Sequence, residues 1–344
     1  GGPNPGPLAY NLGNEHPVVT DANLVLGRIN PHYVLGGRLK IDAQLSRAAM
    51  KKQIADPMGL SVEAAAQGVI SVVNSNMARA IRVITVEKGH NPSDFTLVAY
   101  GGAGPLHAVH LAQEMGIHTV LIPPAPGALC ALGLLTADIK KSYVKTALIP
   151  YDQATPEQIN QAVLPLMEEG SRWLASENVP EQRRQFHNVA EMRYVGQNYE
   201  LQVELPAGKL TQQDLRQMRE DFFRAHEMNY GYYNPNAPVQ FVNFRSEAIG
   251  QVQKPRLAEL TGHMETPSGA VIDHRDVYFE ESGLVRCPVY DRSKFGRCPR
   301  VDGPCIVEQM DSTTVIPPNT WFEVDIHGNL IVNAFGDGKG GDEA

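Results

Sequence analysis

The chain has 344 residues, of which 42% are hydrophobic and 20% are charged, a composition typical of a globular protein with a buried core. Its formal net charge is −8 and no basic block stands out, which argues against a nucleic-acid partner and against binding to an anionic membrane. The sequence has neither an apolar run of transmembrane length nor a leader with a basic start and an apolar core, so we expect a cytoplasmic chain without a membrane span.

The cysteine spacing favours free thiols. The four cysteines match no zinc-ribbon or redox-pair spacing, so we expect reduced thiols and no metal site. The chain opens without Met, in a Pro- and Gly-rich stretch that is typical of the inside of a loop. This opening suggests a processed chain or an excised part of something longer.

The first hundred residues predict a series of helices. The first is expected to begin at Thr20 or Asp21, ahead of an apolar face. Asp21 and Asn23 could then hold a ligand or could simply cap the helix. Further helices are predicted over 42–54 and 61–89, the latter Ala-rich in its first half and suited to close packing.

A glycine turn organises the centre of this region. Gly101-Gly102-Ala103-Gly104 separates an apolar strand, 95–100, from a helix, 105–115, and a second strand follows at 119–122. The short crossover predicts that the two strands pair in parallel. Such glycines let a ligand reach bare backbone and the free N–H groups of a helix start. The turn lacks the G-x-G-x-x-G spacing and the Walker lysine, so ligand contact and a merely tight connection both stay open.

The rest of the chain predicts an α+β region followed by a β-rich one. A Pro-rich turn leads into a helix of small residues, 128–135, which we expect to be tightly packed. The α+β region is expected to contain a helix over 155–178, a strand pair at 187–194 and 199–205, a helix over 211–230 and a strand at 238–249.

Short strands separated by turns follow from Pro255 and predict a small β-barrel or sandwich. We therefore expect one α/β domain over 1–150, an α+β domain over 151–254, a β-rich domain over 255–334 and a disordered tail over 335–344.

A set of linked motifs resembles the hydantoinase A / 5-oxoprolinase family, which includes subunits of ATP-dependent acetone and acetophenone carboxylases. The motifs occur in order along nearly the whole chain, at Thr20–Arg28, Gly36–Leu39, Tyr100–Ala108, Arg193–Leu201 and Gln309–Thr314. The resemblance implies an α/β fold: a partial actin-like (ribonuclease H-like) ATPase domain, then an α+β region and a small β-rich domain.

The resemblance also assigns site residues. Gly101, Gly102, Ala103 and Gly104 match the adenosine motif of that fold, so their backbone is expected to line the base and ribose of ATP. The catalytic candidates are Asp21 and Asn23, in a family motif with Arg28, and His107 on the helix after the turn.

Other motif residues have competing interpretations. His107 and His110 lie at i and i+3, a spacing that could hold a metal or could serve helix packing or a hydrogen bond to a facing strand. The remaining motif residues are expected to organise contacts between domains or subunits or to build a polar turn: Arg193, Gln197, Glu200, Asp311, Ser312 and Thr313.

The implied activity is ATP-driven opening of a small cyclic amide or imide such as hydantoin or 5-oxoproline. ATP would phosphorylate the ring carbonyl oxygen, with Mg²⁺ and donors placed around the phosphates. Members of the family carry two phosphate loops that are absent from these 344 residues. We therefore expect the isolated chain to be inactive and to need the other half of the ATPase domain and a hydantoinase B-type partner.

Other functions remain open at this level. The chain could instead be a subunit of an ATP-dependent ketone carboxylase, which these residues do not separate from a cyclic amide hydrolase. It could also be a non-catalytic assembly module of such a complex, which the absent phosphate loops favour for the isolated chain.

Overall fold

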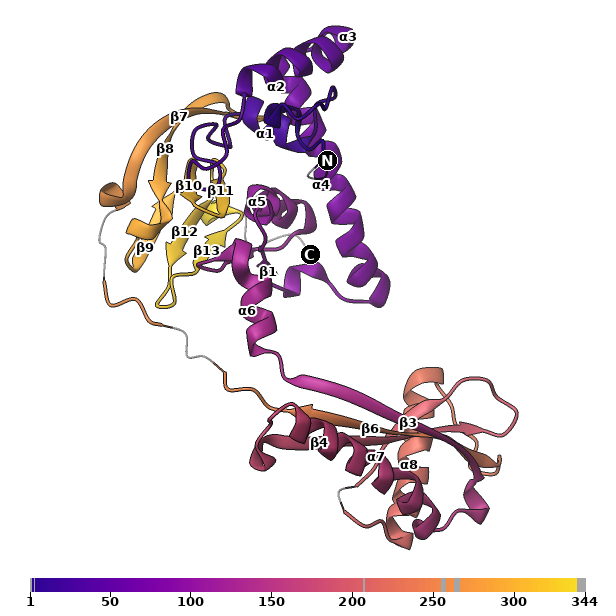
Figure 1. Cartoon of the computed structure of the whole chain (residues 1–344). Coiled ribbons are helices and arrows are strands. Elements are labelled where there is room, and N and C mark those ends of the chain that lie inside the picture. Colours follow the sequence, from indigo (N-terminus) through magenta and orange to yellow (C-terminus); the bar gives the residue numbers. More distant parts are fainter. Residues whose placement is uncertain (1, 3, 207, 255–257, 263–266, 339–344) are drawn as a thin grey trace. The chain divides into compact units, whose positions relative to one another are not determined.

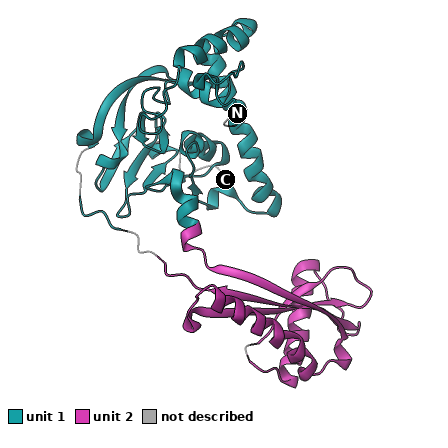
Figure 2. Ribbon diagram, in the orientation of Figure 1, with its two compact units in different colours: residues 1–133, 256–344 teal, residues 134–255 magenta. Residues whose placement is uncertain are grey.

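The computed structural model describes residues 2, 4–206, 208–254, 258–262 and 267–338. The chain divides into two compact units, one built from residues 1–133 and 256–344 and the other from residues 134–255 (Figure 2). We call them unit 1 and unit 2. Unit 1 is therefore discontinuous in sequence, and the second unit is inserted into it.

Two helices of unit 1 begin directly after a side-chain cap. Helices α2 and α4 start directly after Asp42 and Ser61, whose side chains accept hydrogen bonds from first-turn N–H groups. Helix α1 corrects the prediction, because it starts after Val18 and Asp21 caps it from inside the first turn. The helices, seen in Figure 1, are α1 (Val19–Val25), α2 (Ala43–Met50), α3 (Asp56–Met58), α4 (Val62–Ile84), α5 (Gly104–Met115) and α6 (Leu129–Thr136).

The predicted β-turn-α-β unit is present. Leu97 and Val98 pair in parallel with Val120 and Leu121 of the next strand, so the predicted parallel pairing is confirmed. Both strands belong to a five-stranded sheet with the order β1-β2-β13-β12-β9. Its strands are β1 (Leu97–Val98), β2 (Thr119–Ile122), β9 (Cys298–Asp302), β12 (Trp321–Val324) and β13 (Leu330–Asn333).

This sheet corrects the expectation of a separate β-barrel or sandwich. Strand β13 pairs antiparallel with β2, Val332 lying opposite Val120, and both side chains are fully buried. The C-terminal strands thus complete a core that the first 133 residues begin. Alternating apolar residues predict which face of a strand is buried, but they do not predict which sheet edge the strand joins.

The remaining strands of unit 1 form a four-stranded sheet with the order β11-β10-β8-β7. Strands β10 and β11 form a hairpin, and β10 also pairs in parallel with β8. Leu106 of α5 joins the buried cluster of this sheet, so α5 packs against both sheets of unit 1 and against α4. The strands are β7 (Val271–Phe279), β8 (Gly283–Asp291), β10 (Cys305–Gln309) and β11 (Ser312–Ile316).

Unit 2 is a four-stranded antiparallel sheet with the order β3-β6-β4-β5 and the helices α7 and α8. The predicted α+β character, the strand pair and both helices are confirmed, whereas strand β3 was missed. Gly170 of α7 allows close packing, since a Cβ there would lie 2.7 Å from Ala248 Cβ. The elements are β3 (Ile139–Pro150), α7 (Pro156–Ser176), β4 (Arg184–Tyr194), β5 (Leu201–Glu204), α8 (Gln212–Tyr230) and β6 (Val239–Gly250).

These units differ from the division into domains at 150, 254 and 334. Residues 139–150 form β3 of unit 2, and the described residues after 256 belong to unit 1. In the tail expected to be disordered, Phe335 packs against the core and Gly336–Gly338 form a 3-10 helix. Residues 339–344 lie outside the described residues.

Two helices depart from what the sequence predicts. Helix α6 was expected to be tightly packed, yet it has no buried residue, and Leu134 and Leu135 are 79% and 74% exposed. The segment Val62–Lys88 is long and apolar enough to cross a membrane by length and composition, although the sequence had suggested no such run. Small buried residues of α4, including Ala66 and Ala78, pack into unit 1.

Candidate functional site

The glycine turn lies at the carboxyl end of β1 and leads directly into α5. Gly101 has a φ of +79°, a conformation that favours glycine, and its N–H donates to Pro126 O at 2.7 Å. Gly102 and Ala103 are exposed, and no side chain caps the start of α5. The turn therefore presents bare backbone and helix N–H groups at the end of a parallel strand, where α/β sheets bind ligands.

The tip of the β10–β11 hairpin holds this turn in place. The Asp311 carboxylate accepts from Gly127 N at 2.9 Å, across 184 residues of sequence, and from Gln309 Nε2 at 2.6 Å. The carbonyl oxygen of Asp311 would lie 3.2 Å from a Cβ on Gly102. Asp311 thus lies at the connections that follow both parallel strands. The hairpin turn is Met310-Asp311, whereas Ser312 and Thr313 of the predicted polar turn belong to β11.

A pocket of about 120 Å³ adjoins the turn. Gly102 and Leu106 form one wall, and the hairpin tip forms another. Most of its lining is apolar, and its residues are Ile29, Asn30, Tyr33, Val34, Leu35, Gly102, Leu106, Glu308, Gln309, Met310, Asp311, Ser312 and Thr313.

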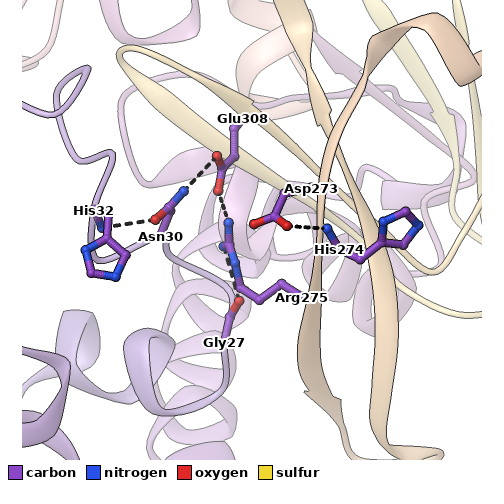
Figure 3. A network of polar contacts seen from close by, with 7 residues as sticks. All are labelled: Gly27, Asn30, His32, Asp273, His274, Arg275 and Glu308. Carbon is purple, nitrogen blue, oxygen red and sulfur yellow. Dashed lines mark hydrogen bonds and ion pairs between the residues drawn. The ribbon is translucent and has the colours of Figure 1, made fainter.

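A buried ion pair supports this pocket (Figure 3). Glu308 is 3% exposed, pairs with Arg275 and accepts from Asn30 Nδ2 at 3.2 Å. Arg275 also donates to Gly27 O at 3.4 Å, which ties β7 to the end of α1. Sequence reasoning missed Arg275 and Glu308, although a glutamate that directly follows the apolar residues Cys305–Val307 was a usable signal.

A second polar cluster lies between α4 and α5. His107 is 6% exposed and its Nδ1 is 2.8 Å from Asn74 Oδ1, so its hydrogen-bond partner lies on helix α4 and not on a facing strand as expected. His110 Nε2 is buried without a partner among the described residues. The described residues contain no group of three or more metal-ligating side chains, so no third ligand of this kind joins the two histidines there.

Arg28 lies beside these histidines and is fully buried. Its Nη2 donates to Gln67 Oε1 at 2.9 Å, while Nε and Nη1 find no partner in the described part of the chain. Burial, and then the positive charge of Arg28, lower the pKa of His107 and of His110 to about 4. Both imidazoles are therefore neutral near pH 7.

A larger cavity of about 460 Å³ opens next to this cluster. Its lining is polar and includes Gln67, Asn74 and His110. Gln67 and Asn74 were not singled out from the sequence, because polar residues on an amphipathic helix do not reveal whether they face solvent or a neighbouring helix.

Asp21 and Asn23 are fully or almost fully buried and form hydrogen bonds with neighbouring groups of unit 1. Asp21 accepts from the backbone N–H groups of Leu8 and Ala9 at 3.1 and 2.9 Å, and from Ser46 Oγ at 2.6 Å. Asn23 Nδ2 donates to Val19 O at 3.1 Å. Neither residue lines the pocket beside Gly102, so the structure does not bring them together with the glycine turn.

The motif around Arg193 forms a contact inside unit 2. Arg193 Nη1 lies 2.9 Å from Glu200 Oε1, which closes the connection between β4 and β5. Two of the residues that were expected to organise contacts between domains or subunits therefore pair with each other inside unit 2.

Comparison with known proteins identifies the family. Residues 1–143 match the model described as Hydantoinase/oxoprolinase, and residues 151–333 match that of the Hydantoinase/oxoprolinase C-terminal domain. The chain belongs to the hydantoinase/oxoprolinase family. The resemblance drawn from the motifs is therefore confirmed.

Related proteins are about twice as long. The chain is 35% identical to caprolactamase subunit alpha from Pseudomonas jessenii over 94% of this chain and 47% of that protein. The structure of ATP-dependent caprolactamase from this organism matches with a TM-score of 0.76 and 34% identity, over 97% of this chain and 49% of that one. The chain thus spans about half the length of the curated relatives that it matches first.

A solved acetone carboxylase structure, from work on ATP-dependent acetone carboxylation, matches with a TM-score of 0.85 and 27% identity. The match covers 95% of this chain and 48% of the carboxylase chain. Together the two structures confirm the expected fold class, a partial actin-like α/β domain with an α+β region and β-rich strands.

The neutral histidines predict a pH-dependent stability of unit 1. Because their folded-state pKa is near 4 and the ordinary value is 6.5, the unfolded chain binds protons between these values that the folded chain does not. The free energy of unfolding should therefore fall as the pH drops from 6.5 to 4, by roughly 1 kcal/mol per pH unit for each imidazole.

Urea unfolding at several pH values checks this, in a Trp173→Phe background where Trp321 of unit 1 is the remaining tryptophan. His110→Gln should reduce the slope of stability against pH, whereas His90→Gln, at an exposed histidine, should not. An unchanged slope in His110→Gln would contradict a neutral, buried His110.

The contact between Asp311 and Gly127 predicts that substitutions at the two positions have non-additive effects on the free energy of unfolding. A Cβ on Gly127 would lie 2.6 Å from Asp311 Oδ2, so Gly127→Ala must displace the carboxylate. Each of Gly127→Ala and Asp311→Ala should lower the free energy of unfolding by about 1–2 kcal/mol. The double variant should cost clearly less than the sum, because both substitutions disrupt the same hydrogen bond between Gly127 N and the Asp311 carboxylate, which can be lost only once. Additive losses in urea unfolding would show that Asp311 does not brace Gly127.

Proposed function

We propose that this chain is part of an ATP-dependent cyclic amide hydrolase of the hydantoinase/5-oxoprolinase type. The observation that carries the proposal is the exposed glycine turn at the carboxyl end of β1, in a chain of this family. Gly101, Gly102, Ala103 and Gly104 would bind the base and ribose of ATP through their backbone. ATP would supply a phosphoryl group that converts the ring carbonyl oxygen into a good leaving group.

The described residues suit contacts to the adenosine part of ATP better than contacts to its phosphates and Mg²⁺. Exposed backbone at Gly102 and Ala103, and a helix start without a side-chain cap, suit the adenosine side. No cluster of three or more His, Cys, Asp or Glu side chains that could hold a metal ion occurs among these residues, so they supply no complete protein cage for Mg²⁺. In our proposal the phosphate and Mg²⁺ contacts belong to the other half of the ATPase domain, and the isolated chain does not hydrolyse ATP.

Asp21, Asn23 and His107 take a supporting role in this proposal. Their burial and their hydrogen bonds to Ser46, Val19 and Asn74 favour shaping the site over touching the substrate. The complete enzyme would be a cytoplasmic hetero-oligomer that includes a hydantoinase B-type subunit.

A ketone carboxylase subunit is the second candidate. The specific observation in its favour is the likeness to the acetone carboxylase structure, whose TM-score of 0.85 exceeds the 0.76 of caprolactamase. Caprolactamase has the higher sequence identity, 34% against 27%, which favours the hydrolase.

The adenosine-side contact predicts an unusual ligand preference. If this chain holds only base and ribose, calorimetry should give similar, weak affinities for ATP, ADP and adenosine. Gly102→Asp should weaken all of them at least about tenfold, because the added carboxylate meets the Asp311 backbone and fills the turn. Gly68→Asp adds the same charge at an exposed site of α4 with open space around it and should bind like the parent chain. Nucleotide affinity unchanged by Gly102→Asp would refute the site.

A substrate screen separates the two candidates. In the assembled complex, phosphate release from ATP should rise with hydantoin, 5-oxoproline or caprolactam and should not respond to acetone with bicarbonate. The reverse response would favour the carboxylase.

A further inference from the structure

The pocket beside Gly102 has the shape and chemistry of a small binding site. Its volume is about 120 Å³, and it lies between the loop 29–35, the start of α5 and the β10–β11 hairpin. The walls are mainly apolar side chains with one aromatic ring: Ile29, Tyr33, Val34, Leu35, Leu106 and Met310. A mostly apolar pocket with few polar groups is the usual form of a site for a small organic ligand.

Two polar side chains meet on one face of the hairpin at this pocket. Thr313 lies directly opposite Glu308 in the strand register, so both side chains project from the same face. Both residues line the pocket. The Thr313 hydroxyl makes no hydrogen bond within the described part of the chain, so it is free to donate or to accept.

The charged groups at the pocket already have partners. Arg275 pairs with Glu308, and the Asp311 carboxylate accepts from Gly127 and Gln309. The lining includes no Lys or Arg, so an anionic ligand would enter a largely apolar pocket beside two carboxylates, which is costly. An uncharged ligand with a hydrogen-bond donor suits the pocket, because a carboxylate oxygen can accept more than one hydrogen bond.

We propose that this pocket binds a flat, uncharged ring that presents an N–H group beside an acceptor atom. The N–H donates to the Glu308 carboxylate, and the Thr313 hydroxyl donates to the neighbouring acceptor. Asn30 holds the Glu308 carboxylate at 3.2 Å and thereby orients it. Because Gly102 lines the pocket, the ring lies against the glycine turn.

Two ring systems share this chemistry. One is the amide edge of a cyclic amide or imide, and the other is the amino edge of adenine. The inference rests on the proposed function, which supplies both rings as ligands of one site. It goes beyond that function by assigning recognition of the ring to the C-terminal hairpin.

Adjacent threonines offer a matched test. Thr313→Val and Thr314→Val are the same nearly isosteric change at neighbouring positions of β11, but Thr314 is 1% exposed and its register partner is Val307 instead of Glu308. The Thr314 hydroxyl is buried without a partner among the described residues, so its removal breaks no hydrogen bond there. Both variants should therefore fold, which unfolding by urea verifies.

The measurement is the affinity of the full chain for hydantoin and for adenosine, each probed alone by ligand-observed NMR at millimolar concentration. Thr313→Val should weaken at least one probe about fivefold, the loss of one neutral hydrogen bond, and Thr314→Val should leave both unchanged. The affected probe identifies the ring that the pocket takes.

Several outcomes would overturn the assignment. It falls if neither ring binds, or if Thr313→Val and Thr314→Val have equal effects. If adenosine binding depends on Gly102 but not on Thr313, and hydantoin does not bind, the pocket assignment fails while the nucleotide site stands. If hydantoin binding depends on Thr313 but neither adenosine nor ATP binds, the pocket stands and the proposed ATP function fails.

Discussion

The contact between the β10–β11 hairpin and the connections after the two parallel strands is the constraint on which unit 1 depends. Asp311 accepts from Gly127 N and packs its carbonyl oxygen against Gly102. Glycine at both positions allows this close approach, since a Cβ would lie 2.6 Å from Asp311 Oδ2 at position 127 and 3.2 Å from Asp311 O at position 102. The hairpin therefore fixes the turn that our proposal assigns to nucleotide, and it joins the two sequence segments of unit 1 at that place.

The buried charged side chains of unit 1 differ in how they are paired. Glu308 and Arg275 form an ion pair that Asn30 completes, and together they present a satisfied carboxylate to the pocket. Arg28 is fully buried with a single hydrogen-bonded partner among the described residues. Burial of the neighbouring imidazoles, and then the charge of Arg28, keep them neutral. A buried, weakly paired cation is costly, so the fold must offset it elsewhere. Such a cost beside a polar cavity is typical of functional regions.

The extent of the chain relative to its family limits which chemistry it contributes. It spans about half of the relatives it matches first, and their names include both a lactam hydrolase and a ketone carboxylase. In our proposal this half supplies the adenosine side and a ring pocket, and the phosphate contacts lie elsewhere.

The sequence by itself determined the local features: the helix that begins after Ser61, the β-turn-α-β unit and the family motifs, because each depends on residues close together in the chain. Only the tertiary structure decided how distant parts meet. It joined β13 to β2, exposed α6 and paired Arg275 with Glu308. Periodicity predicts an apolar face but not the partner that covers it, and a polar side chain does not show whether it faces solvent, a cap or a buried charge.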